Sequence, residues 1–227
     1  MRSMKRVPVP SLATLGAIAF AVALPTQADS GDSGEAILRA MSEKLVAARV
    51  LAVDARRTID PALVPGDVVK EAATLRVVVE RPASIHGQAT DPAGTRRLLF
   101  DGKELSIVDE NELGTFHATA KLEAASVDAL SDMMIERFGF QPLLAEFFSE
   151  DPYALFMEGV ESVRLVGDEQ VDGVTCHRLE FTQEGHRTDL WIGAKDSLPR
   201  KLTITIEELG AEPQIVADLS RWELDQD

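Results

Sequence analysis

Histidine and cysteine are among the scarcest residues of this chain whose side chains could ligate a metal or act as nucleophiles. The histidines are scattered, each in a different segment: His86, His117, His177 and His186. His177 and His186 flank one predicted hairpin, but two imidazoles without a third nitrogen or sulfur ligand do not form a structural zinc site. Cys176, the single cysteine, has no helix start rich in Lys or Arg nearby to lower the pKa of its thiol. It is predicted to be a small, partly buried strand residue, and no metal site is expected.

Motifs for catalysis and cofactor binding are missing from the sequence. The chain contains no phosphate loop of the GxGxxG or GxxxxGKS/T type, no GxSxG and no HExxH. Acid pairs such as Glu207-Glu208 fall in predicted turns, without an apolar pocket that would raise the pKa of a carboxyl group. We therefore expect no cofactor and no catalytic constellation, and predict that the protein is not an enzyme.

Large, flexible apolar side chains concentrate in one stretch of the chain, between residues 133 and 157. Five of the nine Phe and three of the six Met lie there: Phe138, Phe140, Phe147, Phe148, Phe156, Met133, Met134 and Met157. Phe and Met fill irregular spaces and suit adaptable apolar surfaces. The stretch is either ordinary core or a lid over an apolar cavity, and the residue pattern leaves both interpretations open.

These residues belong to a predicted helical insert over residues 126–157. Ser126 is a suitable N-cap, and Gly139 is placed to end the first helix. The apolar face of that helix would consist of Val127, Leu130, Met134 and Phe138, broadened by Met133. Pro142 and Asp151-Pro152 each indicate a further helix start, because proline is tolerated in the first turn. The insert is therefore predicted to contain several short helices.

The segments on either side of the insert read as strands, after one helix over residues 35–48. Strands are expected over 49–58, 73–80, 84–89, 95–100, 103–109 and 114–119, and again over 160–166, 174–182, 187–192, 200–207 and 214–222. Short turns such as Asp101-Gly102 favour antiparallel hairpins. Single-faced apolar strands in this number predict an α+β fold: a strongly curved antiparallel sheet, an incomplete β-barrel, with the N-terminal helix and the insert on its concave face.

The N-terminus has the layout of a secretory signal peptide. A basic start is followed by an apolar run over residues 12–24 and by small residues, so cleavage is expected after Ala28. The run is too short to span a membrane, which takes roughly 20 residues. Residues 1–28 are thus the predicted signal peptide, residues 29–34 are predicted to be disordered, and residues 35–227 form one domain. The mature protein is expected to be periplasmic, without a transmembrane segment.

Charge narrows the range of partners. The formal net charge of the chain is −15, and residues 1–28 contain basic residues but no acid, so the mature protein is more acidic still. Such a charge argues against nucleic acid or an anionic membrane surface as a standing partner.

Several blocks of sequence resemble a known family. They are Glu80-Arg81-Pro82, LLFDGKELSIVDE (98–110), PLLAEFFSEDPYALFMEGV (142–160), VGDEQVDGVTCHRLEF (166–181), DLWIGAKDSLPRKLTIT (189–205) and DLSRWEL (218–224). Over about residues 33–224 the chain resembles a family of bacterial exported proteins that is grouped with the LolA/LolB-like superfamily of periplasmic lipoprotein carriers. The resemblance implies an incomplete antiparallel barrel, closed by helices, that binds acyl chains or other apolar groups. It also leaves room for a sensing role, because the domain of the sigma-factor regulator RseB shares the fold.

Three hypotheses follow, and the third is a hydrolase, whose signature would be a titrating residue with a shifted pKa in a cleft; the sequence shows none. The first is a soluble periplasmic carrier or binder of an apolar ligand: a lipid, an acyl chain or a lipoprotein. Its cavity would be lined on the insert side by Met133, Met134, Phe138, Phe147, Phe148 and Phe156, and on the sheet side by Leu75, Val77, Val79, Leu202, Ile204 and Ile206. The second is a protein-interaction or sensing module, whose acidic surface or sheet edge would bind a protein partner in the envelope.

Overall fold

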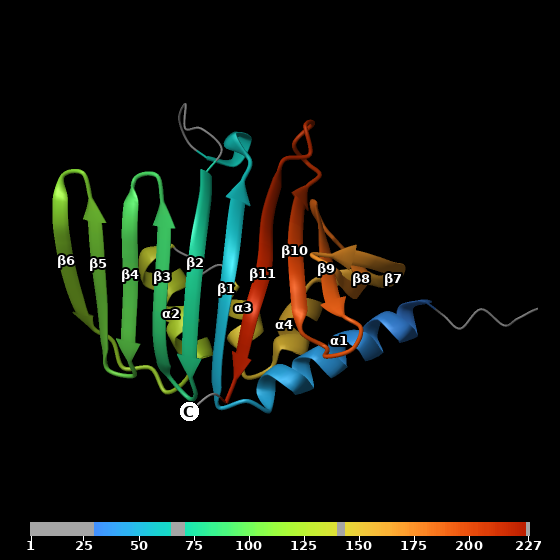
Figure 1. Cartoon of the computed structure of the whole chain (residues 1–227), viewed down its shortest axis with the longest axis horizontal. Coiled ribbons are helices and arrows are strands. Elements are labelled where there is room, and N and C mark those ends of the chain that lie inside the picture. The colour runs from blue at the N-terminus through green and yellow to red at the C-terminus, as the bar shows by residue number, and fades with distance from the viewer. Residues whose placement is uncertain (1–29, 65–70, 140–143, 226–227) are drawn as a thin grey trace, which may run out of the picture.

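The structure is a computed structural model that describes residues 30–64, 71–139 and 144–225 (Figure 1). The predicted signal peptide and cleavage site, Phe140, Pro142 and the side chain of Phe138 lie outside the described residues. Strands β1–β6 are Val50–Ile59, Glu71–Glu80, Ser84–Asp91, Gly94–Asp101, Glu104–Asn111 and Gly114–Lys121. Strands β7–β11 are Val160–Val171, Val174–Gln183, His186–Gly193, Pro199–Ile206 and Gln214–Leu224.

The described strands form one antiparallel sheet that does not close into a barrel. Its order is β6-β5-β4-β3-β2-β1-β11-β10-β9-β8-β7, so β6 and β7 are the two edges. β1 and β11 pair in the middle of the sheet, and all the other neighbours are consecutive hairpins. The strands match the expected segments, and the predicted α+β class with an open antiparallel sheet is confirmed.

The helices lie on one face of this sheet, called here the inner face (Figure 1). They are α1 (Ser30–Val46), α2 (Val127–Phe138), α3 (Ala145–Phe148) and α4 (Pro152–Met157), and a short 3-10 helix, Pro61–Leu63, follows β1. The predicted caps of α2 are present, because the Ser126 side chain accepts a hydrogen bond from the Ala129 amide and Gly139 has a φ of 62°. Asp151 caps α4 in the same way, ahead of Pro152.

The start of α1 corrects one expectation. Residues 29–34 were expected to be disordered because they are small, polar and acidic, but the helix begins at Ser30. Gly34 explains the difference: it is buried, and a Cβ placed on it would lie 3.3 Å from the backbone nitrogen of Leu165 in β7. A residue without a side chain thus lets the helix pack closely on the strand, and composition alone carries no sign of that contact.

Cross-strand register arranges the inner face of β1–β6 in rows. The first row is Leu51, Val79, Ile85, Phe100, Leu105 and Ala120, and the second is Val53, Val77, Gly87, Leu98, Ile107 and Ala118. The third is Ala55, Leu75, Ala89, Arg96, Asp109 and Phe116. We call the first two the apolar rows. Because alternate residues share a face, Arg57, Asp91 and Asn111 follow as a fourth row, at the ends of their strands.

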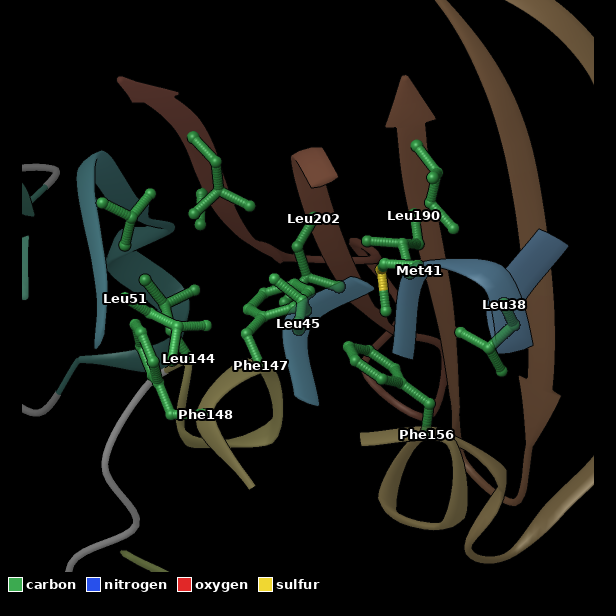
Figure 2. Packing of buried hydrophobic residues seen from close by; sticks show 14 of the residues in the cluster. Leu38, Met41, Leu45, Leu51, Leu144, Phe147, Phe148, Phe156, Leu190 and Leu202 are labelled. Atoms are coloured by element: carbon green, nitrogen blue, oxygen red, sulfur yellow. The ribbon is translucent and has the colours of Figure 1, made fainter. Parts of the chain in front are cut away.

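Helices and sheet enclose two hydrophobic clusters. The first joins α1, α3 and α4 to β1 and to β7–β11, and Figure 2 shows Met41 and Leu45 between strand residues and the rings of Phe147 and Phe156. Those two rings lie 5.2 Å apart. The second cluster joins Leu130 and Met134 of α2 to residues of β4 and β5. The inner face of β2 and β3 lies between the two clusters.

Candidate apolar binding site

A cavity of about 510 Å³ lies between α2, α3 and the inner face of β2–β5. Its size is typical of small-molecule sites, which occupy roughly 300–1,000 Å³. The apolar part of its wall consists of Leu75, Val77, Val79, Ile85, Leu98, Val127, Leu130, Met134, Ala145 and Phe148. These side chains come from the apolar rows, from Leu75 of the third row, and from the facing sides of the two helices.

The cavity is open because small residues stand in the middle of its floor. Gly87 occupies the second row, and its neighbour two residues along β3, Ala89, occupies the third. A Cβ added to Gly87 would meet Leu98 at 3.9 Å, an ordinary contact, so the missing side chain reflects space and not a backbone requirement. Among the described residues, α2 covers this part of the face with α3 beside it, and α2 ends at Gly139.

Hydrogen bonds hold α2, the helix over the cavity, at its N-terminal end. The amide of Val127 donates to the Pro82 carbonyl at 3.0 Å, which ties the start of α2 to the β2–β3 turn. Asp128 accepts from the Ser149 hydroxyl at 3.1 Å and from the Glu150 amide at 3.0 Å, which ties α2 to the residues after α3. The N-terminal end of α2 is therefore fixed to both its neighbours.

Arg81 fastens α3 to the sheet. Its guanidinium donates to the Ala48 carbonyl at 3.2 Å and to the Phe148 carbonyl at 3.0 Å. Burial lowers the pKa of Arg81, since desolvation disfavours its charged form, and the charge of Asp128 opposes that shift. One cation thus links the α1–β1 junction to the end of α3 beside the cavity.

The other end of the cavity is polar. Arg57, Asp91, Arg96, Asp109 and Asn111 line it, and we call these residues the rim. Arg96 donates to Asp109 from Nε at 3.0 Å and from Nη2 at 2.5 Å. These hydrogen bonds lower the pKa of Asp109. Asp91 accepts from the amides of its own turn, at 2.7 Å from Ala93.

The predicted ligand-binding residues divide into two groups. Leu75, Val77, Val79, Met134 and Phe148 line the cavity. The others lie elsewhere: Phe147, Phe156 and Leu202 are buried in the first cluster and Ile204 packs against it, Met133 packs against the second cluster, and Ile206 is half-buried in β10. The reason is that β10 faces α1, α3 and α4, so its alternating apolar face is filled core.

Sequence reasoning left out part of the wall. Val127 and Leu130 belong to the predicted apolar face of the first insert helix, which was a usable signal. Ile85 and Leu98 lie opposite Val79 and Gly87 in the ladder, and only the hairpin register places them beside the predicted residues. The rim arginines carry no sequence signal, because an arginine in a strand is usually a solvated residue.

A second hollow, of about 810 Å³, lies on the outer face and is polar. Its charged residues pair with one another: Arg76 lies 2.8 Å from Asp54 and Arg56 lies 3.2 Å from Asp218. Trp191 lines it too, and its indole donates to Glu169 at 2.8 Å. Although this hollow is larger, its polar groups already satisfy one another, so the apolar cavity is the better candidate for a ligand site.

The residues with metal-binding or nucleophilic chemistry are dispersed. Within residues 30–64, 71–139 and 144–225, no group of three or more His, Cys, Asp or Glu is placed to hold a metal ion. His177 contacts Asp168 at 2.6 Å, whereas His186 lies beside the turn at the other end of the β8–β9 pair and contacts the Glu184 carbonyl. Cys176 is fully buried, and burial raises the pKa of its thiol. None of the described helices is long and apolar enough to cross a membrane.

Comparison with known proteins assigns the chain to a family. A family described as "Predicted periplasmic protein (DUF2092)" matches residues 34–227, so the chain belongs to it. This description also confirms the expected periplasmic location. A search of curated proteins gave no match.

Solved structures agree on the fold. Lipoprotein LppX of Mycobacterium tuberculosis is 14% identical, with a TM-score of 0.51 over 87% of this chain and 99% of that chain. LprF of Mycobacterium bovis is 12% identical, with a TM-score of 0.50 over 86% and 95%. LolA superfamily protein NE2245 of Nitrosomonas europaea is 16% identical, with a TM-score of 0.36 over 86% and 94%. The LppX and LprF structures thus show that this chain shares their fold.

Proposed function

We propose that the protein binds an apolar ligand, such as a lipid or an acyl chain, in the cavity between α2 and β2–β5 and carries it in the periplasm. The observation that supports this function is the uncovered apolar wall, where Leu75, Val77 and Leu98 face a space of about 510 Å³. The resemblance to the LolA/LolB-like superfamily implies the same class of ligand.

Apolar burial would supply the binding free energy. Each methylene that leaves water contributes about 0.8 kcal/mol, less the cost of ordering the ligand and the cover. Because the N-terminal end of α2 is fixed to Pro82 and Ser149, entry would require its far end, at Gly139, to move away from the sheet. The cycle would then be opening, capture and transfer to a partner in the envelope.

Native mass spectrometry tests the proposal on the mature protein, purified from an envelope fraction without detergent. We expect a discrete added mass that extracts into organic solvent and identifies the ligand class. A single mass that matches the chain alone, together with no saturable binding of a neutral fluorescent probe such as N-phenyl-1-naphthylamine at micromolar concentration, would count against a carrier.

A variant that fills the cavity tests the site. Gly87→Leu puts a side chain into the middle of the cavity floor, where the backbone tolerates a Cβ. His86→Leu is the matched control, because His86 is the adjacent residue of the same strand and is exposed on the outer face. We expect Gly87→Leu to lose probe binding while remaining folded, and His86→Leu to retain it. Equal binding by both variants would place the ligand elsewhere.

A protein-interaction module is the second candidate, and the β6 edge supports it. All side chains of Gly114–Lys121 except Ala120 are exposed, and Phe116 is 54% exposed. The backbone of an edge strand offers unpaired hydrogen-bonding groups to an added strand. Recovery of a salt-sensitive protein partner from envelope extract, without any bound lipid, would favour this function over the carrier.

A further inference from the structure

The wall of the cavity changes character along the strands. The apolar rows lie toward the β2–β3 and β4–β5 turns, where α2 begins. The rim lies at the opposite ends of the same strands, next to the turns that join β3 to β4 and β5 to β6. A molecule that fills this cavity would therefore meet apolar side chains at one end and polar side chains at the other.

Arg96 is available at the rim. Asp109 receives hydrogen bonds from its Nε and Nη2, and Nη1 has no hydrogen-bond partner among the described residues. The side chain is 66% exposed, so the guanidinium lies at the mouth of the cavity and not in its floor. Guanidinium groups bind carboxylates and phosphates through parallel hydrogen bonds.

Arg57 approaches the same mouth from the other side. It is half-buried in β1, two residues beyond Ala55, and lines the cavity together with Arg96 of β4. Arg57 and Arg96 are the basic residues of the lining within the described chain. Of the acids beside them, Asp109 accepts from Arg96 and Asp91 accepts from the backbone of its own turn. An acidic protein of net charge −15 thus presents two guanidinium groups at the open end of an apolar cavity.

We propose that the ligand is an amphiphile whose apolar chain lies on the apolar rows and whose anionic head, a carboxylate or a phosphate, is held at the rim by Arg57 and Arg96. This inference rests on the proposed binding function and adds the chemical class and orientation of the ligand. The head stays at the mouth, partly in water, so a partner or a membrane surface could take the ligand head first.

The sequence supplies matched controls, because each rim arginine has an arginine next to it on the outer face. Arg56 pairs with Asp218 and Arg97 pairs with Glu110, both away from the cavity. The double variant R57Q/R96Q therefore removes both charges from the rim, and R56Q/R97Q removes the same charges from the same two strands on the other face.

The experiment is displacement of N-phenyl-1-naphthylamine from the mature protein by hexadecanoate, methyl hexadecanoate and hexadecyl phosphate. Wild-type protein should bind both anions roughly tenfold more tightly than the ester, the effect expected of charge-assisted hydrogen bonds at a partly exposed site. R57Q/R96Q should lose this preference and keep its affinity for the ester, whereas R56Q/R97Q should retain it. The preference should also fall as salt is added.

The possible results of this displacement experiment contradict different parts of the proposal. Equal affinity of wild-type protein for the acid, the phosphate and the ester would overturn the head-group inference and leave the carrier proposal standing. A preference that survives in R57Q/R96Q would overturn the assignment to these arginines. Failure of every competitor to displace the probe would overturn the proposed function, and this inference with it. Tighter binding of only one of the two anions would identify the head group.

Discussion

The two halves of the inner face are both built from helices packed on apolar strands, but one half is filled and the other contains a cavity. Under α1, α3 and α4, the strands from β7 to β1 are packed solid by residues such as Met41, Phe147 and Phe156. Under α2 and the edge of α3, strands β2–β5 keep an open cavity. Both halves present apolar strand residues to helices, so the apolar pattern of a strand does not tell whether it packs in a filled core or lines a cavity. What distinguishes the two halves is how many helices pack on the strands, together with the small residues Gly87 and Ala89 in the cavity floor.

The largest effect should come from the filled half. Phe147→Ala removes a ring with no exposed surface from the first cluster, so the free energy of unfolding should fall by about 3–5 kcal/mol. Urea denaturation followed by circular dichroism measures it. A loss below about 1 kcal/mol would mean that this half can collapse around the gap and is not tightly packed.

The second largest effect on stability should come from Arg81, which links the two halves. Arg81→Ala removes the cation that bonds the Ala48 and Phe148 carbonyls, and should cost about 1–3 kcal/mol of stability because both buried acceptors lose a partner. Arg49→Ala is the control: its ion pair with Glu80 is 70% and 51% exposed, so it should cost less than about 1 kcal/mol. Equal losses in the two variants would contradict a structural role for the Arg81 bonds.

A wall residue of the open half should matter less to stability than to binding. Met134→Ala enlarges an existing cavity, so the loss should fall at or below the low end of the roughly 2–5 kcal/mol seen for core methionines. Affinity for a longer acyl chain should rise relative to a shorter one. The adjacent Ile135, 46% exposed on α2, gives the control variant Ile135→Ala, which should leave chain-length preference unchanged.

The smallest effect concerns pH. Asp109 has its pKa lowered by hydrogen bonds from Arg96, so its carboxylate stabilises the fold above the unfolded-state pKa of about 3.9. That contribution disappears as pH falls through the lower folded-state value. Asp109→Asn should therefore flatten the acid end of the stability curve. Parallel curves for wild type and Asp109→Asn would refute the pairing.

Local sequence signals predicted the elements of this fold well. Asp101-Gly102 closes a hairpin, and Ser126 and Gly139 bound α2, because turn and cap chemistry depends on neighbouring residues. These features require no knowledge of what packs against them.

The site could be predicted only in part, because it depends on which helix covers which strands. Phe147 and Phe148 are adjacent, chemically alike and both buried in the first cluster, yet only Phe148 also lines the cavity. Leu202 has the same pattern as Leu75, but it is buried in the first cluster, whereas Leu75 is only partly buried and lines the cavity. Contacts such as that of Gly34 in α1 with β7 decide this, and they join residues that are far apart in the sequence.

The burial of Cys176 makes the protein convenient for labelling. Its thiol has no exposed surface and an elevated pKa, so thiol reagents will leave it unmodified while the protein stays folded. A cysteine introduced at an exposed position of α2, such as Ile135, would then react alone and could carry a fluorophore that follows the helix during ligand exchange. Modification of Cys176 in the same sample would then show that the sheet itself had unfolded.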